Sequence, residues 1–96
     1  MVESAQARLA RALIELAGAG RDAGGDPIHI SHVTHELLAS YVGTTREVVT
    51  LFMNQFRRRN YLTYSRKGIT IYPDCLWKVV LGEEAPNATV KRGRPL

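Results

Sequence analysis

Residues 34–59, THELLASYVGTTREVVTLFMNQFRRR, decide the fold of the chain. They form two short amphipathic segments separated by Gly43, which can adopt the positive φ that a tight turn requires. Thr34 is a favourable N-cap for a helix over 35–41, and Thr44 or Thr45 for a helix that begins at residue 45 and ends at 59. The stretch therefore predicts a helix-turn-helix.

The two sides of the second helix differ when its residues are placed about 3.6 to a turn. The apolar side, expected in the core, carries Val49, Phe52, Met53 and Phe56. The opposite side carries Glu47, Leu51, Asn54 and Arg58, flanked by Arg46 and Thr50. Long polar groups with one leucine suit the major groove of DNA, where an apolar side chain can contact a thymine methyl. A single exposed leucine is also common on solvated helices. The first helix is expected to bury Leu37, Leu38 and Ala39.

The N-terminal flank supplies a first helix over 4–17, with Ser4 as N-cap and one apolar stripe. A loop of glycine, aspartate and proline follows over 18–27, and then a short strand over 27–33. The three histidines are His29, His32 and His35. Because a strand alternates faces and no cysteine or acidic cluster completes a ligand set, we expect no metal site and no cofactor.

The C-terminal flank predicts a β-hairpin over 63–72, with Arg66, Lys67 and Gly68 at its tip. Asp74 is expected to cap a last helix over 75–81. The predicted fold is therefore mainly α with a small β-hairpin wing, a winged helix-turn-helix with a three-helix core. One domain is expected over 1–82, followed by a disordered basic tail over 83–96.

The charge is divided unevenly along the chain. Residues 1–44 hold three basic and five acidic side chains, whereas residues 45–96 hold ten basic and four acidic ones. A positive second half indicates a polyanionic partner or, more simply, a solvated basic face. There is no apolar run near the ~18 residues of a membrane span and no signal-peptide pattern. The single cysteine, Cys75, fits a cytoplasmic location, and no catalytic motif indicates an enzyme.

Two segments carry a resemblance to a known family. LLASYVGTTREVV (37–49) followed by YLTYSRKGITIY (61–72) resembles the C-terminal DNA-binding domain of the CRP/FNR family of bacterial transcription regulators. The resemblance covers roughly residues 4–80. It implies sequence-specific binding of double-stranded DNA, with the helix over 45–59 in the major groove. The alternative is a winged-helix module for protein interaction or dimerisation, which an exposed apolar patch of Val48, Leu51 and Tyr41 would favour.

The resemblance also assigns roles to residues. Base contacts are expected from Arg46, Glu47, Thr50, Leu51 and Asn54. Contacts to the DNA backbone are expected from Thr34, His35, Thr44, Thr45, Arg58, Arg66 and Lys67. For Thr34 and Thr45, pure helix capping is an equally good interpretation. Leu51 departs from the family, because many members have an arginine there, so a guanine preference should be lost.

Family members further carry a sensor domain and a dimerising helix, which the 96 residues lack, so a homodimer is expected of a full-length regulator. The tail contains Arg-Gly-Arg-Pro (92–95), which resembles an AT-hook. Arg92 and Arg94 could insert into a narrow minor groove. A solubilising tail is the favoured interpretation of this segment.

Overall fold

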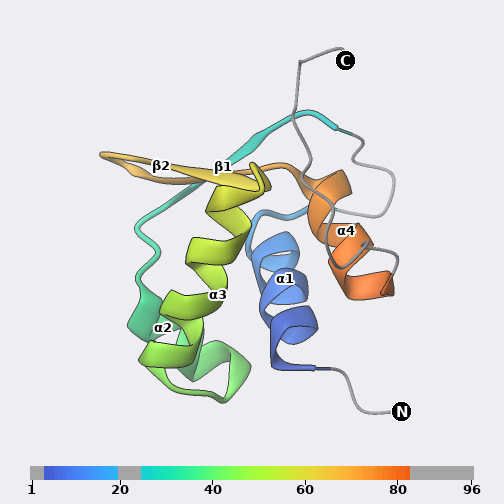
Figure 1. Ribbon diagram of the computed structural model, residues 1–96. Helices are drawn as coiled ribbons and strands as arrows, with labels where there is room; N and C mark the ends of the chain where they lie inside the picture. The colour runs from blue at the N-terminus through green and yellow to red at the C-terminus, as the bar shows by residue number, and fades with distance from the viewer. Residues whose placement is uncertain (1–3, 20–24, 83–96) are drawn as a thin grey trace.

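A computed structural model describes residues 4–19 and 25–82. Within these ranges the helices and strands are α1 (Ala5–Leu16), β1 (Ile28–Ser31), α2 (His35–Val42), α3 (Arg46–Arg58), β2 (Leu62–Ser65), β3 (Gly68–Ile71) and α4 (Pro73–Leu81). The predicted fold class is confirmed: α1, α2 and α3 form the helical core, and β2 and β3 form the wing (Figure 1). The tail over 83–96, with Arg92 and Arg94, and residues 20–24 of the expected loop lie outside the described residues.

Side-chain caps begin three of the helices as predicted. The hydroxyls of Ser4, Thr34 and Thr45 each accept a hydrogen bond from the backbone N–H three residues on, at 3.1, 3.0 and 3.2 Å. Each bond satisfies one of the N–H groups that the first turn of a helix leaves without a partner. Gly43 ends α2 with a φ of 84°, and its N–H donates to the Ala39 carbonyl at 2.8 Å. The predicted turn between α2 and α3 is therefore present.

Two details of the predicted helices are wrong. Leu37 was expected in the core but is 48% exposed, because the two-turn α2 buries only the side that carries Leu38 and Ala39. Asp74 does not cap α4, since that helix already begins at Pro73, with Tyr72 in the N-cap position. Proline suits the first helical position because its fixed φ is helical and the missing N–H has no intrahelical partner there.

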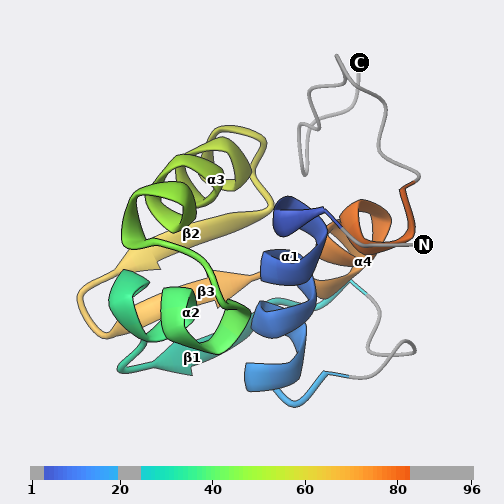
Figure 2. The same cartoon turned by 90° about the horizontal axis from the view of Figure 1, so that it is seen from below.

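The strand over Ile28–Ser31 joins the wing and makes a three-stranded antiparallel sheet of order β1-β3-β2. The sheet lies across one end of α1 and α3 (Figures 1 and 2). Gly68 was expected at the hairpin tip, but it begins β3 opposite Ser31 and leaves only Arg66 and Lys67 in the turn. A Cβ atom at Gly68 would overlap the carbonyl oxygen of Ile30, so the approach of β1 requires glycine here.

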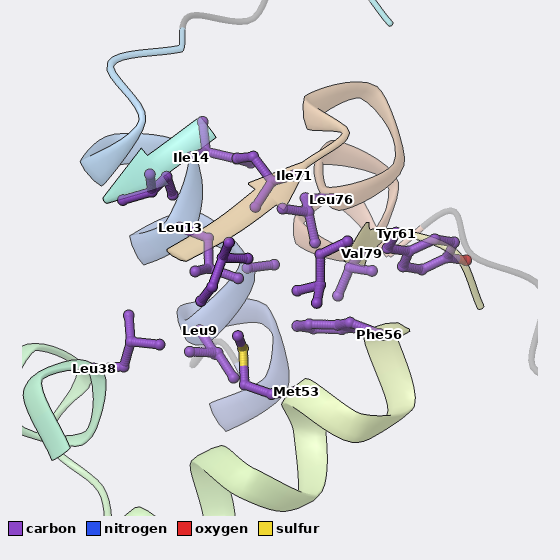
Figure 3. Packing of buried hydrophobic residues seen from close by; sticks show 14 of the residues in the cluster. Leu9, Leu13, Ile14, Leu38, Met53, Phe56, Tyr61, Ile71, Leu76 and Val79 are labelled. Atoms are coloured by element: carbon purple, nitrogen blue, oxygen red, sulfur yellow. The ribbon is translucent and has the colours of Figure 1, made fainter. Parts of the chain in front are cut away.

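A single hydrophobic core joins the helices to the sheet (Figure 3). Its fully buried members include Leu9, Leu13, Ile14, Leu38, Met53, Phe56, Tyr61, Ile71 and Leu76. Because α3 and both β2 and β3 contribute to this core, it fixes α3 and the base of the wing relative to each other. No helix in residues 4–19 and 25–82 combines the length and hydropathy of a membrane span.

Candidate nucleic-acid interface

The helix α3 separates its two faces as its sequence predicts. Val49, Met53 and Phe56 are completely buried, and Phe52 packs half-buried against the same core. The outward face carries Arg46, Glu47 and Leu51, all exposed, with Thr50 and Asn54 half-buried beside them. Leu51 is 52% exposed, so one apolar group lies among polar ones on this face. The predicted base-contacting residues therefore share one accessible side of α3.

The wing and α3 carry a strong positive charge. Residues 45–72 contain six basic side chains and a single acidic one, Glu47. The basic side chains that are exposed are Arg46, Arg57, Arg58, Arg66 and Lys67. They lie at both ends of α3 and at the tip of the hairpin. This arrangement places positive charge at both ends of α3 and on the neighbouring wing, which favours binding to a polyanion.

His35 links three elements at the centre of this surface. It is the first residue of α2, and its Nδ1 lies 2.7 Å from Oγ1 of Thr50 on α3. Its Nε2 lies 2.8 Å from the hydroxyl of Tyr64 on β2. The imidazole ring of His35 and the ring of Tyr64 are tilted by 50° to each other, with centroids 6.1 Å apart. One imidazole therefore contacts both α3 and the wing.

The surroundings shift the titration of both rings in this link. Partial burial of the imidazole, together with the positive charge of Arg46, lowers the pKa of His35 below its ordinary value. Burial raises the pKa of Tyr64, and the positive charge of Arg57 opposes that shift. The lowered pKa of His35 and the raised pKa of Tyr64 both favour the uncharged forms of these rings. Near neutral pH the link is therefore an imidazole hydrogen-bonded between two hydroxyl groups.

Two depressions flank the link, each about 390 Å³ in volume. The first, between the wing and the segment before α2, is lined by His32, Val33, Thr34, Tyr64, Ser65, Arg66, Lys67, Gly68 and Ile69. The second, between α2 and α3, is lined by Thr34, His35, Glu36, Arg46 and Thr50. Thr34 lines both depressions. Four residues predicted to contact the DNA backbone therefore line these depressions, Thr34, His35, Arg66 and Lys67, beside the predicted base contacts Arg46 and Thr50 of α3.

Other residues chosen from the sequence lie differently. Thr44 is half-buried in the turn, where its N–H donates to the Ala39 carbonyl at 2.9 Å. His29 contacts Thr70 on the sheet, at 3.3 Å, and does not join His35. Within residues 4–19 and 25–82, no three histidine, cysteine or acidic side chains gather where a metal ion could be held.

Tyr64 is the interface residue that the sequence interpretation missed. The hairpin alternates, so Tyr64 shares the face of Leu62, which is buried, although Tyr64 itself is 41% exposed. That alternation was visible in the sequence and could have indicated that Tyr64 points toward the helices. Its partner could not be inferred, because His35 lies 29 residues away in the chain.

Comparison with solved structures gives the same architecture. TTHA1359, a transcriptional regulator of the CRP/FNR family from Thermus thermophilus, is similar with a TM-score of 0.64 and 25% identity, covering 82% of this chain and 41% of that protein. The CO-dependent transcription factor CooA from Carboxydothermus hydrogenoformans has a TM-score of 0.62 and 23% identity, and the match covers 80% of this chain and 37% of that protein. CprK complexed with OCPA has a TM-score of 0.64 and 19% identity, and the match covers 79% of this chain and 38% of that protein.

This chain therefore spans between 37% and 41% of the length of these three structures. A search of curated proteins found no match. The family model of the Crp-like helix-turn-helix domain, in contrast, matches residues 7–73, which include most of α1, the helix-turn-helix and the whole wing. The chain belongs to the family of Crp-like helix-turn-helix domains.

Proposed function

We propose that this chain binds double-stranded DNA sequence-specifically, as the DNA-binding domain of a transcription regulator, with α3 in the major groove. The observation that carries the proposal is the division of α3. Its apolar side is locked in the core, whereas Arg46, Glu47 and Leu51 are exposed on the other side. A rigid helix with long polar side chains outward, set beside a basic wing, has the form that major-groove recognition requires.

The exposed side chains have the chemistry to distinguish base pairs. Arg46 can donate two hydrogen bonds to O6 and N7 of guanine, and Glu47 can accept one from the amino group of cytosine. Leu51 can contact a thymine methyl group. Thr50 and Asn54, half-buried on the same side, offer shorter polar groups at the edge of the groove. These five residues are the proposed base contacts.

Seven residues are proposed to contact the DNA backbone: Thr34, His35, Thr44, Thr45, Arg58, Arg66 and Lys67. Four of them, Thr34, His35, Arg66 and Lys67, line the two depressions. Support comes from Arg58, Arg66 and Lys67, which are exposed and basic, and from Thr34, which lines both depressions. Such contacts fix the position of a protein on the duplex but do not by themselves distinguish sequences.

A regulator built on this domain is proposed to act in the cytoplasm as a homodimer. The chain covers less than half of each similar transcription regulator. One winged helix contacts one half-site, and two linked half-site contacts raise the affinity far above that of one.

The test is a titration with duplex DNA at two salt concentrations, followed by selection of bound sequences from a random duplex pool. Arg46→Ala should relax discrimination at one base pair, at a cost of roughly 1–3 kcal/mol. Arg46→Lys keeps the charge and can still donate to O6 and N7 of guanine, so it should keep the salt dependence and weaken the preference less than Arg46→Ala does. Lys78→Ala, which removes an exposed charge from α4, is the matched control. It should change neither the base preference nor the salt dependence of binding.

Two results would contradict the proposal. One is an unchanged sequence preference in Arg46→Ala, which would remove Arg46 from the base contacts. The other is no duplex binding at low salt, which would favour the protein-interaction alternative. That alternative needs an exposed apolar patch that includes Tyr41 and Leu51, which are 53% and 52% exposed. The Tyr41 hydroxyl, however, donates to Glu15 of α1, so the Tyr41 side chain is directed to that helix.

A further inference from the structure

The contacts of His35 join residues that are far apart in the sequence. Thr50 lies 15 positions from His35, and Tyr64 lies 29 positions from it. Each of these two residues also lines one of the two depressions: Thr50 the one beside Arg46, and Tyr64 the one beside Arg66 and Lys67. The imidazole therefore lies between the two places where the chain gathers groups for DNA.

The hydrogen count of the link restricts both hydroxyls. A neutral imidazole has one N–H donor and one acceptor nitrogen. Whichever tautomer is present, one hydroxyl must donate its only hydrogen to the ring while the other accepts a hydrogen bond from it. The donating hydroxyl has no hydrogen left for another partner, whereas the accepting hydroxyl keeps its hydrogen free.

This restriction matters at a DNA surface. Phosphate oxygens and the N7 and O6 or O4 atoms of the bases are acceptors, so a hydroxyl must donate to bind them. While His35 is neutral, only one of Thr50 and Tyr64 can donate outward at a time. A contact made by the recognition helix at Thr50 therefore sets the hydrogen-bonding state of the wing at Tyr64, and the reverse also holds.

We propose that His35 is a positioning residue that holds the wing against the recognition helix and makes the hydroxyls of Thr50 and Tyr64 act as one coupled unit. The coupling of hydrogen-bond donation to DNA rests on the DNA-binding function proposed above. The mechanical link between helix and wing does not, because both hydrogen bonds are present in the free chain.

The first test uses the free 96-residue chain and NMR. Tyr64→Phe and Thr50→Val each remove one hydroxyl and keep the shape of the side chain. Tyr64→Phe is expected to shift the methyl resonance of Thr50, and Thr50→Val to shift the ring resonances of Tyr64. Both shifts should vanish in a His35→Ala background. Shifts that persist without His35, or that are absent with it, would overturn the proposal.

Two conservative variants separate the link from simple packing. The amide of Asn takes the place of Nδ1 of histidine and can reach only Thr50, whereas that of Gln takes the place of Nε2 and can reach only Tyr64. Both His35→Asn and His35→Gln should fold, as monitored by circular dichroism, and each should keep one bond and lose the coupling. Full coupling in either variant would show that imidazole is not needed.

The second test is a double-mutant cycle on duplex binding with Thr50→Val and Tyr64→Phe. With His35 present, the effects of the two substitutions on Kd should depart from additivity by about threefold or more. In the His35→Gln background the two effects should be additive. Additive effects with His35 present would overturn the coupling to DNA, while leaving sequence-specific binding in place. If no variant binds DNA, the proposed function fails, and the NMR result alone decides whether His35 links helix and wing.

Discussion

Nε2 of His35 lies 2.8 Å from the hydroxyl of Tyr64, which joins the first residue of α2 to the middle of the wing strand β2. The hydrophobic core holds the wing at its base, through Leu62 and Ile71, which pair in the sheet. Tyr64 is one pleat further toward the tip, where the side chain is already 41% exposed. Because Ile69, the β3 partner of Tyr64, is still buried in the core, the polar link adds a second restraint at this level of the wing, on β2.

The same link predicts how stability depends on pH. The pKa of His35 in the folded chain is lowered, by burial and by Arg46, below the ordinary value of 6.5 that applies when the chain is unfolded. Between these two pKa values the unfolded chain binds more protons, so stability should fall as the pH is lowered through this window. The charged groups nearby are Arg46 on α3 and Glu36, which lines the same depression.

Chemical denaturation of the chain and of His35→Gln, at pH values from about 5 to 8, measures this effect. The difference in unfolding free energy between the two proteins should decrease as the pH falls below about 6.5. A difference that stays constant over this range, or that grows at acidic pH, would contradict the assigned direction of the shift.

Gly68 provides a test of the sheet. Its φ is 150°, and a Cβ there would overlap the Ile30 carbonyl oxygen of β1. Gly68→Ala should therefore lower the unfolding free energy by roughly 2–4 kcal/mol. Gly43→Ala is the matched control, because Gly43 also has a positive φ, 84°, but has open space around it. It should cost only about 1–2 kcal/mol. If the two variants lose equal amounts of unfolding free energy, β1 can move away from the new Cβ atom at residue 68 without cost.

The sequence predicted the parts of this domain that local patterns specify. The caps at Thr34 and Thr45, the turn at Gly43 and the buried side of α3 each depend on neighbouring residues, and the structure has all of them. The start of α4 was wrong because two local signals competed, and proline at the first helical position prevailed over an Asp74 cap.

Long-range features could not be predicted in the same way. The pairing of β1 with β3 joins segments about 40 residues apart, and no local pattern specifies such a partner. The contact of His35 with Tyr64 follows from that packing. Most of the candidate interface could be chosen from periodicity and family resemblance, whereas the residue that connects its two halves required the structure.

Thr34 allows helix capping to be separated from contact with the DNA backbone. Asn and Asp both cap helices at least as well as Thr, so Thr34→Asn and Thr34→Asp should unfold within about 0.5 kcal/mol of the unchanged chain. Only Asp adds a negative charge between the two depressions. Since one charge about 4 Å from phosphate in water is worth about 1 kcal/mol, Thr34→Asp should bind duplex DNA roughly fivefold more weakly than Thr34→Asn at low salt. The gap should narrow as salt is added. Equal affinities would show that Thr34 only caps α2.

Leu51 lies where the family resemblance leads us to expect an arginine, and its side chain is 52% exposed on the outward face of α3. Leu51→Arg should create a preference for guanine at one base pair, worth roughly 1–3 kcal/mol, because a guanidinium can donate to both O6 and N7. Stability should change little, since the side chain contributes nothing to the buried core.

An added positive charge alone would strengthen binding to every sequence. Leu81→Arg supplies the same charge from α4, where Leu81 is 45% exposed, and controls for this effect. Selection from a random duplex pool should show a new guanine with Leu51→Arg and none with Leu81→Arg. If both variants gain affinity without a new base preference, residue 51 lies outside the groove, and the placement of α3 on DNA proposed for this domain must be changed.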